Sequence, residues 1–130
     1  MDNNKPLFAK TPICVSVQIS DANTNLDASG TTTVLFTAVK KTMITEIRYK
    51  AITSTLAGFV RVFITDSAGL NPRLFKEMTV GTVTITTSVA SAIGSAFFDN
   101  LVLASGQKIL VSTHNANTFN VFAMGGELED

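Results

Sequence analysis

The sequence predicts an all-β protein, a single antiparallel β-sandwich of about eight strands with a jelly-roll-like arrangement. Apolar and polar residues alternate with a period of two in several segments, and Gly, Asn, Asp and Pro separate these segments at short intervals. No segment has the pattern of a helix of ordinary length. Such short strands favour a sandwich or barrel over a parallel sheet, and eight of them suit a jelly roll, although other sandwiches stay open.

The strands of the N-terminal half are predicted at residues 13–20, 31–38 and 43–53. The first alternates cleanly from Ile13, and it ends at a stretch rich in turn formers, residues 21–30. The third is the most regular. Its charged side chains share the outward face and its apolar side chains the inward face, in the order Glu46, Ile47, Arg48, Tyr49, Lys50, Ala51.

The C-terminal half is predicted to form strands at residues 59–65, 74–80, 83–89, 97–103, 108–113 and 118–124. The first of these is nearly continuously apolar, broken only by Arg61, and its core positions should include Val62 and Ile64. Residues 66–72 form the clearest hairpin connection. The spacing of Val89, Ile93 and Ala96 would also suit a short helix, which the nearby glycine and hydroxyl residues oppose.

The 130 residues predict one sandwich domain, residues 13–126, between two short terminal segments. Residues 1–12 are expected to be a flexible N-terminal arm, and residues 127–130 an acidic tail. The arm carries an isolated apolar pair, Leu7 and Phe8, which could instead dock on a neighbouring subunit or on a host surface. It lacks the apolar core of a secretory signal, and no apolar run is long enough to span a bilayer, so we expect synthesis in a cytoplasm.

The charge balance argues against two classes of partner. Ten Lys and Arg offset ten Asp and Glu, and only 15% of residues are charged, against a usual share of about 25%. Serine and threonine supply much of the remaining polar surface. A net charge of zero gives no footprint for nucleic acid, and no basic stretch is present for an anionic membrane.

No motif predicts catalysis or a cofactor, so we expect neither an enzyme nor a metalloprotein. One histidine, His114, lies in a turn-like segment, where a hydrogen-bonding role is expected, and the single cysteine, Cys14, suits a half-buried strand position. An enzyme acting on polysaccharide would need paired carboxylates, for which Asp66 and Asp99 are the candidates. Oxygen donors alternate from Asp21 to Asp27 as in a calcium loop, but Asx-turns explain them equally.

A run without any charged residue, residues 79–96, is the first candidate for a subunit contact. Interface cores are depleted in charge, and hydroxyl groups cost less to desolvate than ions. The alternative is that this run is an inner strand and loop of the monomer. The candidate subunit or capsid contacts are Leu7, Phe8, Thr82, Thr84, Thr86 and Ser88.

Four blocks together resemble small single-domain β-sandwich virion proteins of tailed bacteriophages: residues 21–31, 44–51, 58–66 and 113–121. The most distinctive is His-Asn-Ala-Asn-Thr-Phe-Asn, which begins at His114. The resemblance covers roughly residues 13–126 and carries over no functional residue. It implies a structural part of a phage particle, located in the virion after synthesis in the host cytoplasm.

Under this resemblance the leading function is a capsid decoration or cement protein that coats or stabilises the head. Its partners would be further copies of itself, as a homotrimer, and the major capsid protein or another virion protein. The alternative is a carbohydrate- or receptor-binding module of a phage tail or fibre. Exposed aromatic rings usually supply the stacking platform for a sugar, whereas here Trp is absent and the nine Phe are expected in the core.

Overall fold

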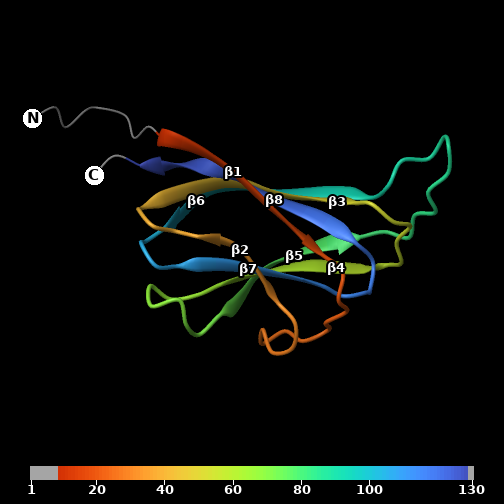
Figure 1. The fold of residues 1–130 in the computed structure, drawn as a ribbon, viewed down its shortest axis with the longest axis horizontal. Helices are drawn as coiled ribbons and strands as arrows, with labels where there is room; N and C mark the ends of the chain where they lie inside the picture. The colour runs from red at the N-terminus through yellow and green to blue at the C-terminus, as the bar shows by residue number, and fades with distance from the viewer. Residues whose placement is uncertain (1–8, 129–130) are drawn as a thin grey trace, which may run out of the picture.

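The computed structural model describes residues 9–128, which form eight β-strands and no helix. Figure 1 shows the strands as two layers with the loops gathered at the two ends of the sandwich. The strands are β1 (Ala9–Ile19), β2 (Thr33–Thr37), β3 (Thr42–Ala51), β4 (Gly58–Ile64), β5 (Arg73–Val80), β6 (Ile93–Leu103), β7 (Lys108–Thr113) and β8 (Phe119–Leu128).

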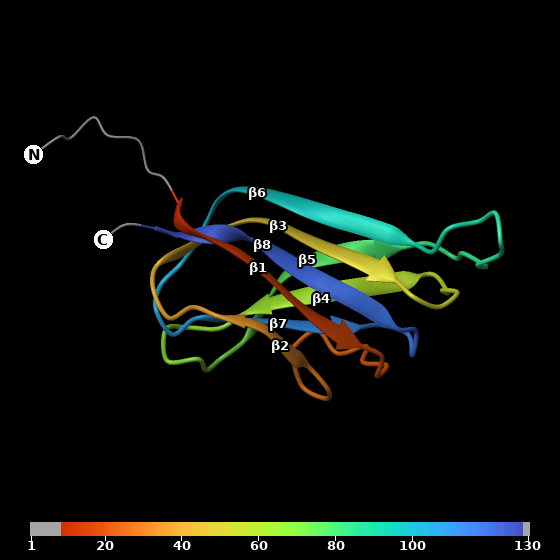
Figure 2. The same ribbon diagram turned by 45° about the horizontal axis from the view of Figure 1, so that its top comes forward.

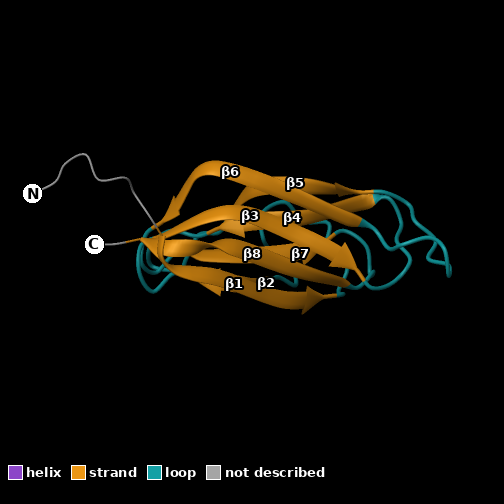
Figure 3. Cartoon of the chain, turned by 90° about the horizontal axis from the view of Figure 1, so that it is seen from above, coloured by secondary structure: helices purple, strands orange, loops and turns teal. Residues whose placement is uncertain are grey.

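The strand order confirms the predicted jelly roll. One sheet has the order β1-β8-β3-β6 and the other β2-β7-β4-β5, and all strand pairs are antiparallel. The chain pairs its first half with its second, β1 with β8, β2 with β7, β3 with β6 and β4 with β5. Figures 2 and 3 show this long hairpin folded over into two stacked sheets. The β4–β5 hairpin is the one connection that stays within a sheet.

The core lies between the two sheets, where the inward residues of successive strands meet. Ile47, Tyr49 and Ala51 are buried and the alternating charged residues of β3 face outward, which confirms the predicted phase of this strand. The Tyr49 ring packs edge-on against Phe119, with 5.4 Å between ring centroids. Val62 is fully buried, and Ile64 is half-buried against the core.

The first and last strands extend beyond the predicted domain boundaries, residues 13 and 126. β1 begins at Ala9, so residues 9–12 belong to the sheet and not to a terminal arm. Pro12 is tolerated there because β1 is an edge strand. β8 continues to Leu128, which is buried and whose N–H donates to the Lys41 carbonyl at 2.9 Å, so the predicted acidic tail begins too early. Leu7 and Phe8 lie outside the described residues.

Residues 83–89 were predicted as a strand, and this prediction is wrong. Only Val83 pairs, in an isolated antiparallel bridge with Thr55. The chain then turns, because the Thr86 N–H donates to the Val89 carbonyl at 3.2 Å and the Thr86 hydroxyl accepts from the Val89 N–H at 3.0 Å. Such local bonds compete with strand pairing. The helix considered around Val89 is also absent, because β6 begins at Ile93.

Candidate functional site

The β5–β6 loop, residues 81–92, is the most exposed part of the uncharged run. It crosses from one sheet to the other and extends from one end of the sandwich in Figures 1 and 2. Every residue from 84 to 90 is exposed, and so is Thr82. The run from 79 to 96 therefore consists of the end of β5, this loop and the start of β6, and the candidate contacts Thr82, Thr84, Thr86 and Ser88 all lie at the surface of the loop.

Hydrogen bonds hold the base of the β5–β6 loop against the β3–β4 loop. The Thr55 N–H donates to the Val83 carbonyl at 2.8 Å, and the Ala57 N–H donates to the Thr82 hydroxyl at 3.1 Å. The Thr86 hydroxyl is engaged within the loop itself. The Ser88 hydroxyl lies 3.4 Å from that of Thr86, so among the four candidate contact residues Thr84 has the hydroxyl least committed to the loop's own structure. The apolar side chains of Ile85 and Val89 are exposed beside them.

A buried arginine ties three loops and strands together on the outer side of the second sheet. Arg61 is only 4% exposed, and its Nε donates to Glu77 Oε2 at 3.0 Å. Its Nη1 donates to the Asn23 carbonyl at 3.3 Å, and its Nη2 lies 3.2 Å from His114 Nδ1. Its guanidinium also lies 5.2 Å from the centre of the Phe59 ring. These contacts indicate a structural role, and they confirm His114 as a hydrogen-bonding loop residue.

The sequence analysis did not find this cluster as a unit. The available signal was Arg61 itself, a lone cation that interrupts an apolar strand segment. A buried charge requires partners, but the partners lie 16, 38 and 53 positions away along the chain. Strand pairing alone brings Glu77 opposite Arg61.

In the loop considered for calcium, residues 21–27, side-chain oxygen atoms accept hydrogen bonds from neighbouring residues of the chain. Asn23 is buried, its amide nitrogen donates to the carbonyls of Ser29 and Thr31, and its amide oxygen accepts from the Asn25 N–H. Asp27 accepts from the hydroxyl and the N–H of Ser29, and these bonds lower the pKa of its carboxyl. The pattern matches the Asx-turn interpretation.

Asp66 likewise organises the β4–β5 loop. Its carboxylate accepts from the N–H groups of Leu70 and Ala68 and from the Asn71 side chain, and these bonds lower its pKa, with the Leu70 bond first. It borders an open pocket of about 340 Å³, lined by Ile64, Thr65, Asp66, Asn71, Arg73 and Gln107. The other candidate carboxylate, Asp99, does not line this pocket. Within residues 9–128, no three His, Cys, Asp or Glu side chains are grouped as metal ligands.

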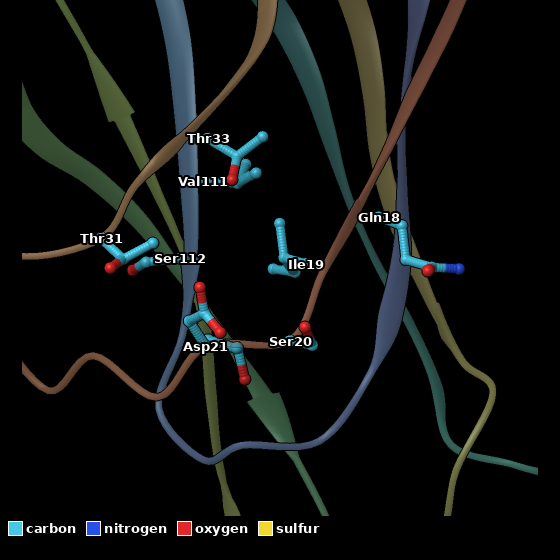
Figure 4. A pocket seen from close by; sticks show the side chains of 9 residues that line it. Gln18, Ile19, Ser20, Asp21, Thr31, Thr33, Val111 and Ser112 are labelled. Atoms are coloured by element: carbon cyan, nitrogen blue, oxygen red, sulfur yellow. The ribbon is translucent and has the colours of Figure 1, made fainter.

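A smaller pocket of about 90 Å³ opens where β1 ends beside β2 and β7 (Figure 4). This volume is large enough to hold water molecules. The lining is mostly hydroxyl-bearing, with one carboxylate, and consists of Gln18, Ile19, Ser20, Asp21, Thr31, Thr33, Val111, Ser112 and Thr113. Among the described buried side chains, the Ser112 hydroxyl alone lacks a hydrogen-bond partner, so water is the simplest occupant.

Comparisons with known proteins add little to these sites. No family model matches the sequence, and no curated protein matches it. A solved structure described as Eiger TNF from S. frugiperda is similar over 93% of this chain and 97% of that chain, with 13% identity and a TM-score of 0.48. Among residues 9–128, no helix is long and apolar enough to cross a membrane.

Proposed function

We propose that this protein is a structural component of a tailed-bacteriophage particle, a decoration or cement protein that self-associates and coats or stabilises the head. The four sequence blocks that resemble phage virion proteins support the virion location. The self-association is supported by the exposed, uncharged β5–β6 loop. The proposed assembly is a homotrimer seated on the major capsid protein.

The exposure of the β5–β6 loop is the observation on which this proposal depends most. A loop that presents Thr84, Ser88, Ile85 and Val89 to solvent can be buried against protein without desolvating an ion. The chain as a whole has a formal net charge of zero, so copies do not repel one another at long range. Both properties suit repeated packing on a shell.

Two measurements test this function. Mass spectrometry of virions produced from the genome that encodes the chain should detect it at a copy number comparable to that of the major capsid protein. Analytical ultracentrifugation of the purified protein at tens of micromolar should show an oligomer. Absence from purified virions would contradict the virion role, whereas a strict monomer would contradict self-association alone.

The second candidate, a carbohydrate- or receptor-binding module, is favoured by the open pocket beside the β4–β5 loop. Its Asp66, Asn71 and Arg73 side chains offer acceptors and donors for sugar hydroxyls around the apolar Ile64. A glycan array should then give binding that Arg73→Ala and Asn71→Ala abolish. No binding on the array or to host cells would remove this candidate.

A further inference from the structure

The two sheets differ in what covers their outer faces. On the β2-β7-β4-β5 sheet, Arg61 and Phe63 alternate with core residues and yet are buried, at 4% and 0% exposure. The outer face of the β1-β8-β3-β6 sheet, which we call the open face, has no described segment in front of it in Figure 3. Two of its apolar side chains, Phe97 and Ile93, are 72% and 59% exposed.

The strand register shows which residues share the open face. They are the residues that alternate with the buried side chains of β3, namely Glu46, Arg48 and Lys50, and their neighbours across the sheet. Three rows run from β1 to β6: Cys14, Met124, Glu46 and Phe97, then Ser16, Phe122, Arg48 and Ser95, then Gln18, Asn120, Lys50 and Ile93. Five apolar and four uncharged polar side chains thus surround a short line of three charges.

These charges are already satisfied within the chain. Arg48 Nη2 lies 2.8 Å from Glu46 Oε2, and the Glu46 side chain is only 13% exposed. Lys50 Nζ donates to the Ser91 carbonyl at 3.0 Å. Glu46 and Arg48 therefore keep a partner of opposite charge when the open face is covered, and Lys50 keeps a hydrogen bond to a neutral carbonyl.

The open face is large enough for a specific interface. Four strands about 4.8 Å apart and ten residues long, at about 3.3 Å per residue, present roughly 600 Å². The exposed β5–β6 loop leads directly into β6, and it enlarges this area toward the roughly 800 Å² that each partner buries in a stable complex. Part of this area is apolar, and Phe97 and Ile93 are the most exposed of its apolar side chains.

A second chain could bind either on the open face or by adding a strand at the β6 edge. The shape of the β6 edge disfavours strand addition. β6 has one sheet neighbour, β3, but its pairing shifts between Leu101 and Phe97, so that residues 98–100 form a bulge. Asp99 lies in this bulge. A bulge and a charge are the features by which edge strands avoid pairing with another chain.

We propose that the open face binds a second copy of this chain. The proposal rests on the proposed self-association and assigns it a surface. The neutral net charge removes repulsion between copies, and the paired Glu46 and Arg48 leave the apolar residues to supply the contact. Phe97 is the expected main anchor of the contact, because exposed aromatic side chains that become buried dominate interface energies.

The test uses the double variant Phe97→Lys/Ile93→Glu, compared with the wild-type chain by analytical ultracentrifugation at tens of micromolar. In the sheet, position 97 is paired with Glu46 and position 93 with Lys50, so each new charge meets an opposite charge in the monomer. The net charge is unchanged. We expect association to weaken by roughly 30-fold or more, as for the loss of a hot-spot aromatic residue.

The matched control is Leu70→Glu, which changes another apolar residue that is 62% exposed, in the β4–β5 loop of the other sheet. It should leave association unchanged, and circular dichroism should show that all variants stay folded. A double variant that associates like the wild-type chain would overturn the proposal and leave the virion role standing. The proposal would also be overturned if the wild-type chain were monomeric and oligomerised only after removal of residues 1–8. The N-terminal segment, and not a second copy, would then cover the open face.

Discussion

Tyr49 shows how a single side chain fixes the distance between the two sheets. It projects inward from β3, and its hydroxyl donates to the Thr79 carbonyl of β5, in the other sheet, at 2.6 Å. Burial raises the pKa of the phenol, so the hydroxyl stays protonated as the donor. A Cβ at Gly94, its partner on β6, would collide with the tyrosine ring. Sequence alternation predicts that Tyr49 is buried, whereas its glycine partner is visible only once the register is known.

Asp66 gives a prediction at the same scale. Hydrogen bonds lower its pKa in the folded protein below the ordinary value of 3.8, so its contribution to stability is present above pH 3.8. That contribution is lost as the pH falls through the lowered folded pKa. Asp66→Asn keeps an acceptor oxygen but turns an NH₂ toward Asn71. It should therefore lower the melting temperature at pH 7, and the difference from the wild-type chain should shrink toward pH 2. A difference that is constant across this range would contradict the role assigned to the carboxylate.

At the scale of elements, the sequence predicts strands well where side chains alternate, and fails where local hydrogen bonds replace pairing. Residues 83–89 have the composition of a strand, but the Thr86 hydroxyl closes a turn within them. The outward position of Phe97 was also missed, because Phe97 and Phe98 are adjacent and only the β6 register shows which one faces the core. Strand order likewise depends on pairings between distant halves of the chain, which no local pattern contains.

The β1–β2 loop, residues 20–32, is held to the sheet by contacts that Arg61 completes. Replacing Arg61 by Met, which is of similar length, leaves the Asn23 carbonyl and His114 Nδ1 without their donor. Arg61→Met should lower the free energy of unfolding by about 2–4 kcal/mol. This is slightly less than the usual loss from breaking a fully buried charged pair, because the Glu77 side chain is partly solvated. Urea unfolding measures this loss, and faster exchange of the Asn23 amide hydrogen would localise it to the loop.

Arg48→Met is the matched control for Arg61→Met, because Arg48 also pairs with a glutamate but its side chain is 45% exposed. Exposed pairs contribute at most about 1 kcal/mol, so this change should be small. Equal losses from the two substitutions would show that the burial of Arg61 does not matter to the stability of the loop.

At the scale of the whole molecule, the two outer faces of the sandwich have different roles. On the second sheet, the outward-facing Arg61 and Phe63 are buried within the chain, although Val34 and Phe75 of its edge strands are exposed. The open face of the first sheet leaves apolar side chains in solvent around an ion pair that is already complete. Because the core between the sheets is intact without a partner, the chain is expected to fold as a monomer and then to associate.

Association of folded copies makes thermal stability depend on concentration, because the oligomer is favoured over the unfolded chain by mass action. A tenfold rise in protein concentration should therefore raise the melting temperature of the wild-type chain, by a few degrees for a domain of this size. The Phe97→Lys/Ile93→Glu variant should melt at one temperature throughout, and Leu70→Glu should follow the wild-type chain. Differential scanning fluorimetry across a hundredfold range of concentration measures all three. A wild-type melting temperature that does not change with concentration would mean that the open face is not buried by a second copy.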